Sequence, residues 1–252
     1  MKHTDGIIIQ ARTGSTRMPR KILLPFSGEQ SILDILIGRI RQSCPELPLI
    51  VATTDNAGDD VIAAAAARSG ALVSRGSEND VLDRFIKAAD EHNLTRIIRV
   101  CSDNPFLRTD TFRTLLDASD ANPLADYVAY AYPGGRPTIK SHIGLYAECV
   151  TIDALRQAAL SPDAVDHEHV TIHIYTHPDR FRTAYLPLPE IIRSRDDIRL
   201  TIDTPDDFAL LTEIYSRYTG GTDGTVEALV ALADSDPRYG RIMKQNISRN
   251  SK

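Results

Sequence analysis

Strand-like and helix-like patterns alternate through the first half of this chain. Three consecutive isoleucines, Ile7 to Ile9, end at a polar turn, and such a run is typical of a buried strand. Strands are expected at 6–11, 47–54, 71–75 and 96–102, and helices at 31–42, 59–69, 80–92 and 110–121. Because strands that alternate with helices of about ten residues form right-handed βαβ units, the sequence predicts an α/β fold with a doubly wound, mainly parallel, Rossmann-like sheet.

The pattern changes after Asn122. Further strands are expected at 126–131, 142–150, 182–188 and 199–203, and helices at 151–160, 167–177, 205–218 and 225–233. No linker rich in Gly, Ser or Pro separates two domains. The sequence therefore predicts a single domain over residues 1–244, with an inserted β-rich segment at about 125–195 that forms a dimer interface or a lid. Residues 245–252 are expected to be a mobile tail.

The composition of the chain narrows its range of partners. With 252 residues, 42% of them hydrophobic, the chain can bury a sizeable core, and its formal net charge is −5. Broad nucleic-acid or anionic-membrane surfaces need an excess of Lys and Arg, so neither partner is expected. No stretch approaches about 18 apolar residues, and three distant cysteines indicate neither a disulfide framework nor a zinc knuckle. We expect a soluble, cytoplasmic protein.

A polar loop follows the first strand and carries several cations. The loop, residues 10–21, contains Gly14 for a close backbone approach and Ser15 as a hydroxyl donor. Open α/β sheets place their ligands at the carboxyl ends of strands, where this loop begins. Its spacing matches neither G-x-x-x-x-G-K-(S/T) nor G-x-G-x-x-G, yet its cations suit a polyphosphate. These cations are Arg12, Arg17, Arg20 and Lys21.

Two aspartates follow later strands in the same way. Asp103 precedes Pro105 at the end of one expected strand, and Asp203 precedes Pro205 at the end of another. Two carboxylates at the sheet edge that carries a cationic loop require a cation between them, and Mg²⁺ binds through one or two carboxylates plus substrate phosphates. The sequence therefore predicts a Mg²⁺ site at Asp103 and Asp203. Alternatively, Asp203 or Thr204 only caps the helix that begins at Pro205.

The loop at residues 10–21 resembles the opening signature of the sugar nucleotidyltransferases, Q-A-R-x-G-S-x-R-(L/M)-P-x-K. It is most similar to the SpsF-like cytidylyltransferases, relatives of the CMP-KDO and CMP-sialic acid synthetases. The resemblance implies a nucleotide-diphospho-sugar transferase fold, a homodimer, and metal-binding aspartates in D-x-P and D-T-P turns, here Asp103 and Asp203. It implies that these aspartates act in catalysis together with Arg12 and Lys21. The nucleotide-binding residues that it implies in the loop are Gln10, Ala11, Arg12, Gly14, Ser15, Arg17 and Lys21.

Residues 74–84 resemble the R-G-(S/N)-x-x-D-V-L-x-R block of the same family, which by this resemblance closes over the base and ribose. A site that reads one base needs fixed donors and acceptors, because an apolar pocket alone separates analogues weakly. Alternatively, Asp80 is only the N-cap of a helix and Arg84 only a solvated helix residue. The nucleotide-binding residues expected here are Arg75, Gly76, Ser77, Asp80 and Arg84.

Two later segments resemble parts of the KDO and SpsF-like enzymes that line the acceptor-sugar pocket or the subunit interface. Residues 142–146 read H-I-G-L-Y, and residues 168–171 read E-H-V-T. The substrate-binding residues expected from them are His142, Tyr146 and His169. His169, His173 and His177 have the spacing of one helix face, which holds zinc only with a further convergent ligand, so a polar face is the simpler interpretation.

Together, these features predict an enzyme that transfers a cytidylyl group from CTP to a hydroxyl of an acidic sugar, with Mg²⁺ as cofactor and pyrophosphate as leaving group. Such catalysis depends on positioning and electrostatics and needs no nucleophilic side chain. A nucleotidyltransferase for another base and a glycosyltransferase are alternatives, although Asn104 and Pro105 after Asp103 depart from the D-x-D motif of glycosyltransferases. A nucleotide-binding regulatory protein without catalytic activity is the alternative of another class.

Overall fold

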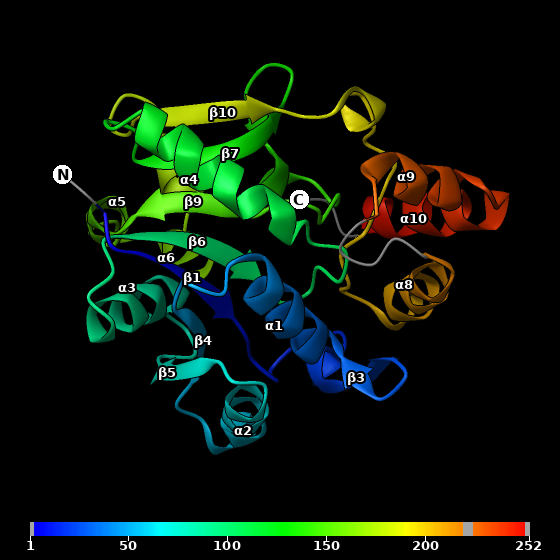
Figure 1. Ribbon diagram of the computed structural model, residues 1–252, viewed down its shortest axis with the longest axis horizontal. Coiled ribbons are helices and arrows are strands. Elements are labelled where there is room, and N and C mark those ends of the chain that lie inside the picture. The colour runs from blue at the N-terminus through cyan, green and yellow to red at the C-terminus, as the bar shows by residue number, and fades with distance from the viewer. Residues whose placement is uncertain (1–2, 219–223, 250–252) are drawn as a thin grey trace.

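A mainly parallel sheet forms the centre of the protein in a computed structural model, which describes residues 3–218 and 224–249 (Figure 1). Its parallel part contains, in spatial order, β5 (Leu72–Gly76), β4 (Leu49–Thr54), β1 (Asp5–Gln10) and β6 (Arg96–Cys101). Because β1 pairs in parallel with both β4 and β6, Gln10 and Cys101 end at the same edge of the sheet. The predicted α/β fold with a mainly parallel sheet is confirmed.

The strands of the segment at 125–195 continue this sheet. β9 lies antiparallel between β6 and β7, and β10 runs parallel to β7. The strands outside the parallel part are β7 (Tyr127–Tyr132), β8 (Arg136–Pro137), β9 (Glu148–Thr151), β10 (Thr183–Pro187) and, in a separate hairpin, β2 (Pro25–Ser27) and β3 (Gln30–Ser31). The β-rich segment therefore extends the central sheet instead of forming a sheet of its own. Its role in dimerisation stays a prediction.

Helices cover both faces of the sheet because successive side chains of β1 point to opposite faces. The helices concerned are α1 (Ile32–Ser43), α2 (Asp60–Arg68), α3 (Val81–Glu91), α4 (Phe112–Ala121) and α5 (Ile152–Ala158). Ile7 and Ile9 belong to the hydrophobic cluster of α1, α2 and α4, whereas Ile8 belongs to that of α3 and α5. The doubly wound arrangement follows from this alternation. α1 begins at Ser31, which forms a capping box with Asp34.

The predicted strands at 142–150 and 199–203 are wrong for most of their length, since only β9 forms. The backbone of Gly144 is left-handed (φ +58°), and a Cβ there would lie 2.8 Å from the carbonyl oxygen of Leu200. The amide of Leu200 donates to the carbonyl of His142 at 2.8 Å. The two segments therefore pack against each other as loops, and this contact requires a glycine.

The predicted helix at 167–177 is broken. Its place is taken by α6 (Ala164–Glu168) and α7 (Ile172–Thr176). Val170 lies at the break with φ +52°, so His169 does not share a helix with His173 and His177, whose rings stack at 4.1 Å. Within the described ranges, no group of three or more His, Cys, Asp or Glu side chains is placed to hold a metal ion. The structure gives the zinc interpretation no support.

Three helices follow the sheet and lie together beside it (Figure 1, right). They are α8 (Pro205–Arg217), α9 (Val226–Asp234) and α10 (Pro237–Arg249). The prediction of a mobile tail from residue 245 is wrong as far as residue 249, because these residues belong to α10. Asn246 is buried and donates to Asp207 at 2.8 Å, which ties α10 to α8. Residues 250–252 lie outside the described part.

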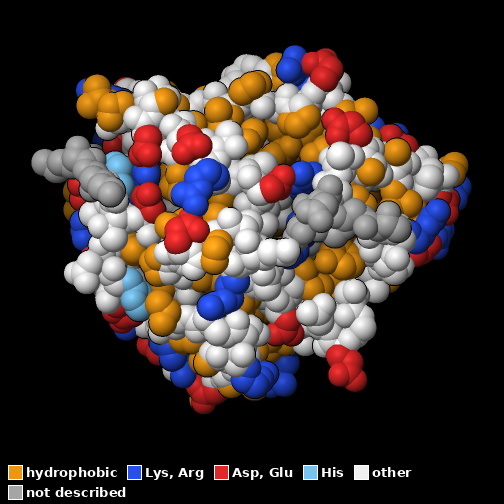
Figure 2. Space-filling model, viewed as in Figure 1, with side chains coloured by type: hydrophobic (Ala, Val, Ile, Leu, Met, Phe, Trp, Pro, Cys, Tyr) orange, Lys and Arg blue, Asp and Glu red, His pale blue; other side chains and the backbone are white. Residues whose placement is uncertain are grey.

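Short 3₁₀ turns connect several of these elements. They are η1 (Lys21–Leu23), η2 (Ala57–Asp59), η3 (Thr109–Thr111), η4 (Thr138–Lys140) and η5 (Glu190–Ile192). On the face shown in Figure 2, basic and acidic side chains are interspersed among hydrophobic ones. Among the helices of the described residues, none has the length and apolar character needed to cross a membrane.

Candidate active site

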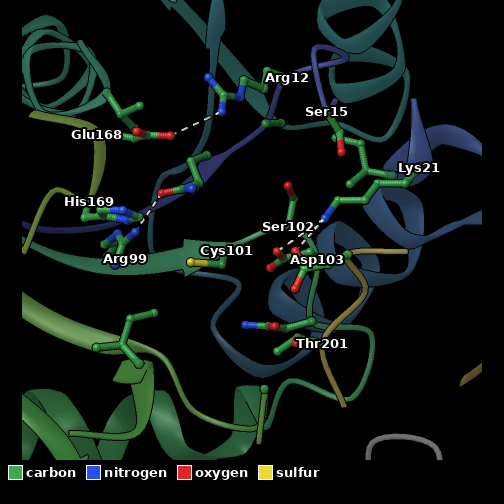
Figure 3. A pocket seen from close by; sticks show the side chains of 18 of the residues that line it. Arg12, Ser15, Lys21, Arg99, Cys101, Ser102, Asp103, Glu168, His169 and Thr201 are labelled. Atoms are coloured by element: carbon green, nitrogen blue, oxygen red, sulfur yellow. Dashed lines mark hydrogen bonds and ion pairs between the residues drawn. The ribbon is translucent and has the colours of Figure 1, made fainter. Parts of the chain in front are cut away.

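A pocket of about 750 Å³ opens at the carboxyl ends of β1 and β6 (Figure 3). A pocket of this size accommodates a small-molecule ligand. One group of lining residues, here called the charged wall, consists of Arg12, Arg17, Lys21, Asp103 and Asp203. A second group, here called the aromatic wall, consists of Lys140, Tyr146, His169 and Tyr175, and the two groups meet where Arg12 pairs at 3.7 Å with Glu168, the neighbour of His169. The predicted cationic loop and the predicted metal-binding aspartates therefore share one cavity.

The pocket brings together most of the residues that the sequence predicts. Those that line it are Gln10, Ala11, Arg12, Gly14, Ser15, Arg17, Lys21, Arg84, Asp103, Tyr146, His169 and Asp203. Those that the structure does not bring to it are Arg75, Gly76, Ser77, Asp80 and His142.

A buried aspartate holds the cationic loop in shape. The backbone amide and the hydroxyl of Thr13 donate to one oxygen of Asp59 at 2.8 and 2.5 Å, and the hydroxyl of Thr54 donates to the other at 2.5 Å. Burial opposes ionisation of Asp59, but the hydrogen bonds from Thr13 and Thr54 outweigh it and keep the pKa of this carboxyl below its ordinary value. The ionised carboxylate therefore ties the loop to the end of β4.

The two predicted metal-binding aspartates face a common cation. Nζ of Lys21 lies 3.5 Å from Oδ2 of Asp103 and 3.5 Å from Oδ1 of Asp203, and it also donates to the carbonyl of Ile202 (Figure 3). Nη2 of Arg17 lies 3.4 Å from the same Oδ1. The amide of Ile202 donates to the carbonyl of Asp103 at 3.0 Å, which fixes the spacing of the two aspartates.

The donor set of this aspartate pair fits Mg²⁺. Asp103 and Asp203 offer hard carboxylate oxygens from two different loops. The ammonium group of Lys21 lies between these two carboxylates, so the space between them attracts a cation. Mg²⁺ characteristically takes one or two protein carboxylates and completes its shell with water and substrate phosphates. These two side chains are therefore the ones that can hold it.

A buried arginine supports Asp203 from behind. Arg199 donates to both oxygens of Asp207 at 2.7 Å and to Oδ2 of Asp203 at 2.8 Å. Its third partner is Nδ1 of His142 at 2.5 Å. Since arginine only donates, His142 accepts here through Nδ1. The predicted substrate contact of His142 therefore finds no support in the geometry, because its ring is engaged in this network and does not line the pocket.

The predicted nucleoside block divides between the pocket and the surface. Arg84 is buried, lines the pocket and donates to the carbonyl of Ser77 at 2.7 Å, so it is not the solvated helix residue of the alternative interpretation. Asp80 is the N-cap of α3 and accepts from the amide of Asp83 at 2.8 Å, which confirms its structural role. Arg75 pairs with Asp60 at 2.6 Å and does not reach the pocket.

The aromatic wall comes from loops and short helices. Tyr146 stacks on Tyr130 with ring centroids 4.3 Å apart, and burial raises the pKa of its phenol, which keeps the hydroxyl protonated as a donor. Lys140, at the end of η4, lies 5.9 Å from the ring centre of Tyr175. This wall therefore combines ring faces with one cationic group.

Comparison with known proteins decides the family. A family model described as cytidylyltransferase matches residues 6–232. The chain belongs to the cytidylyltransferase family. It is therefore a nucleotidyltransferase, and the resemblance found in its sequence is confirmed. The spore coat polysaccharide biosynthesis protein SpsF of Bacillus subtilis (strain 168) is 35% identical over 238 residues, which cover 91% of this cytidylyltransferase-family chain and 94% of the relative.

Solved structures agree with this assignment. A cytidylyltransferase from Leptospira borgpetersenii serovar Hardjo-bovis (strain JB197) superposes with a TM-score of 0.82 at 27% identity, over 94% of this chain and 97% of the other. The structure of CMP:2-keto-3-deoxy-manno-octonic acid synthetase complexed with CTP has a TM-score of 0.62 at 17% identity, over 85% and 99% of the two chains. At that identity the second comparison supports the fold of this cytidylyltransferase-family chain and no more.

Local sequence patterns do not predict several functional residues of this cytidylyltransferase-family chain. Arg99 is buried, pairs with Glu148 and donates to Oε1 of Gln10 at 2.9 Å. Because its oxygen is taken, the Gln10 amide has its NH₂ group left for a ligand. Arg99 lies within a strand of mostly apolar residues. The one clue to its role in the sequence is that a charged residue stands in a strand that is otherwise expected to be buried. Lys140, which lines the pocket, and Asp59, which holds the cationic loop from outside it, belong to no recognisable motif.

Proposed function

We propose that this chain transfers a cytidylyl group from CTP to a hydroxyl of an acidic sugar and releases pyrophosphate, in the assembly of a surface polysaccharide. The observation that carries the proposal is the single pocket in which Arg12, Arg17 and Lys21 lie with Asp103 and Asp203. The substrate classes are supported by two relatives: SpsF, a polysaccharide biosynthesis protein, and the synthetase whose structure contains CTP.

The charged wall suits transfer without a covalent enzyme intermediate. The acceptor hydroxyl attacks the α-phosphorus in line: its oxygen–phosphorus bond forms as the bond to pyrophosphate breaks, and its proton is released to water. Arg12, Arg17 and Lys21 neutralise the charge that develops on the departing pyrophosphate. A Mg²⁺ ion held by Asp103 and Asp203 would supply further positive charge at the phosphate oxygens. The side chains thus orient the reactants and stabilise charge.

Gln10, at the carboxyl end of β1, supports recognition of cytosine. The NH₂ group of Gln10 is free of Arg99 and suits the acceptor atoms O2 and N3 of cytosine, whereas uracil carries a hydrogen at N3. Nε of the buried Arg84 has no hydrogen-bond partner among the described residues, but the atom itself is enclosed and does not face a ligand in this structure. The amide of Gln10 therefore favours a base edge that accepts hydrogen bonds.

The aromatic wall supports an acidic acceptor. Lys140 and His169 line the part of the pocket formed by η4 and the α6–α7 connection, where they offer cationic or hydrogen-bonding groups to a carboxylate. The protonated phenol of Tyr146 suits a sugar hydroxyl. The acceptor hydroxyl would then lie between this wall and the aspartate pair.

Calorimetric titration of CTP, UTP, GTP and ATP, each with and without Mg²⁺, tests the proposal. We expect tight binding of CTP alone, strengthened by Mg²⁺, followed by pyrophosphate release with sugar acids such as 3-deoxy-manno-octulosonate. Preference for another nucleotide would keep the nucleotidyltransferase family but reject the cytidylyl donor. Binding of CTP without turnover across a broad set of sugar acids would favour a regulatory protein.

A further inference from the structure

Lys21 lies where a cation shared by the two aspartates would lie. Its ammonium is equidistant, at 3.5 Å, from one oxygen of Asp103 and one oxygen of Asp203, and its side chain is only 12% exposed. The carbonyl of Ile202 accepts a hydrogen bond from the same ammonium. Figure 3 shows the side chain of Lys21 reaching toward Asp103 and away from Arg12. We propose that Lys21 is an internal counter-cation of this aspartate pair and competes with a divalent ion for it.

The electrostatics around Asp203 favour this competition. Its carboxylate contacts Arg199 at 2.8 Å, Arg17 at 3.4 Å and Lys21 at 3.5 Å. A divalent ion that approaches without a counter-anion meets carboxylates that are already paired, and it is repelled by these neighbouring cations. The free protein is therefore expected to hold a divalent ion weakly.

Lys21 is the cation that can leave. Arg199 is 1% exposed and bound through two nitrogens to Asp207, so its guanidinium is fixed. Lys21 carries a compact charge on a flexible stem at the first position of η1, beside the loop that contains Arg17. A polyphosphate that enters between Arg12 and Arg17 offers Lys21 a new anionic partner. Its withdrawal frees the carboxylate oxygens for the metal.

This inference deepens the proposed function, since the polyphosphate in question is that of CTP. It predicts that metal and nucleotide bind with strong positive coupling, because the triphosphate both draws Lys21 away and adds oxygen ligands. If Lys21 did not compete for the two aspartates, the metal and the nucleotide would bind with a weaker coupling, because the nucleotide would only add oxygen ligands. The first experiment uses no nucleotide and is therefore independent of the proposed donor.

Mn²⁺ titration followed by electron paramagnetic resonance measures this competition directly. Without nucleotide, Lys21→Met is expected to bind Mn²⁺ about tenfold more tightly than the wild type, because a repelling charge about 4 Å away is gone. Lys21→Arg keeps the charge and should bind Mn²⁺ about as weakly as the wild type. Lys21→Gln repeats the test if the methionine variant folds poorly.

Two controls locate the effect. Arg20→Met removes an exposed cation from the neighbouring position, which does not line the pocket, and should change the Mn²⁺ affinity less than about twofold. Adding Asp103→Asn to Lys21→Met should abolish the gain. Equal or weaker Mn²⁺ binding by Lys21→Met would overturn the inference, as would a gain that survives the loss of Asp103.

A second titration, of Mn²⁺ and CTP together, separates this inference from the proposed function. With CTP present, Lys21→Met should bind Mn²⁺ no better than the wild type, and CTP affinity should fall about tenfold because a phosphate contact is lost. A purely structural role for Lys21 would lower Mn²⁺ affinity in both titrations. Failure of CTP to bind while the first gain stands would reject only the donor. Normal CTP binding without that gain would reject only the counter-cation.

Discussion

Most of the charged wall follows the ends of β1 and β6, and only Asp203 follows an extended segment that forms no strand, whereas the aromatic wall consists of loops and short helices. Asp103 follows β6, the cationic loop follows β1, and oppositely charged groups meet within 3.5 Å. Lys140 and His169 instead belong to η4 and to the break before α7. A rigid sheet edge suits the chemistry shared by all substrates of such an enzyme, and loops suit the part that differs between substrates. The charged wall should therefore set the rate and the aromatic wall the choice of acceptor.

The largest effect is expected at Asp103. Asp103→Asn should lower kcat by about 10²–10³-fold, because it removes a charged ligand of the predicted Mg²⁺ site, while the partly exposed position leaves the fold intact. Asp206→Asn is the matched control, since Asp206 is exposed in the first turn of α8 and does not line the pocket. Steady-state pyrophosphate release measures both. Turnover near the wild-type rate in Asp103→Asn would remove the proposed metal site.

A smaller effect on the same wall is expected at Asp59. Asp59→Asn cannot accept all the hydrogen bonds from Thr13 and Thr54, so the loop should lose its shape, and the KM for CTP should rise roughly tenfold. The free energy of unfolding should fall by about 1–3 kcal/mol, because buried hydrogen bonds are lost. Nucleotide kinetics and chemical denaturation test the two parts. An unchanged KM for CTP would show that Asp59 serves stability alone.

Substitutions in the aromatic wall should affect the acceptor and not CTP. Lys140→Met is expected to raise the KM for the acidic acceptor about tenfold and to leave CTP affinity unchanged, since this cation lies beside the ring of Tyr175, whereas Lys21 is the lysine that contacts the aspartate pair. Arg136→Met removes a nearby cation that pairs with Asp196 outside the pocket, and it should affect neither substrate. If Lys140→Met weakened CTP binding instead, the division between the two walls would be wrong.

The smallest effect is expected on stability, at His167, which joins α6 to the start of α3. Both ring nitrogens of His167 face acceptors, the carbonyl of Ser161 at 2.9 Å and the carboxylate of Asp80 at 2.7 Å, and these bonds raise the pKa of the imidazole. Folding therefore favours the protonated imidazole. The bonds of His167 contribute fully to stability below about pH 6.5, the pKa of histidine in the unfolded chain, and this contribution is lost as the pH rises through the higher pKa of the folded state.

Thermal unfolding across pH tests this attachment. The melting temperature of the wild type should exceed that of His167→Gln by roughly 2 °C at pH 5.5, and the difference should shrink by pH 8. The same pair of proteins should show no such trend in CTP affinity, because the charged wall does not include His167. A difference that grows with pH would contradict the protonated state.

The sequence revealed most of the charged wall because strand ends are local features. The isoleucines before Gln10 and the prolines after Asp103 and Asp203 mark where strands or extended segments stop, and parallel topology brings such ends to one edge. Asp59 could not be found in this way. It binds Thr13 across 46 residues, and no local pattern announces that contact.

The aromatic wall was harder to predict because packing decides its backbone. Apolar residues around Gly144 favour a strand, but its left-handed conformation is set by contact with Leu200. Val170 breaks the expected helix without a Gly or Pro to signal it. Residues 245–249 likewise read as a polar tail in the sequence, but they belong to α10, and Asn246 binds Asp207 in the folded chain. In each case a distant contact overrides local propensity.

Product analysis with CTP tests the central claim most directly. The purified protein would be incubated with CTP, Mg²⁺ and 3-deoxy-manno-octulosonate or another sugar acid, and the mixture examined by mass spectrometry for a CMP-linked acid formed in step with pyrophosphate. We predict such a product from CTP and not from UTP, with its formation lost in Asp103→Asn. Equal yields from both nucleotides, or an unchanged yield in that variant, would contradict the account.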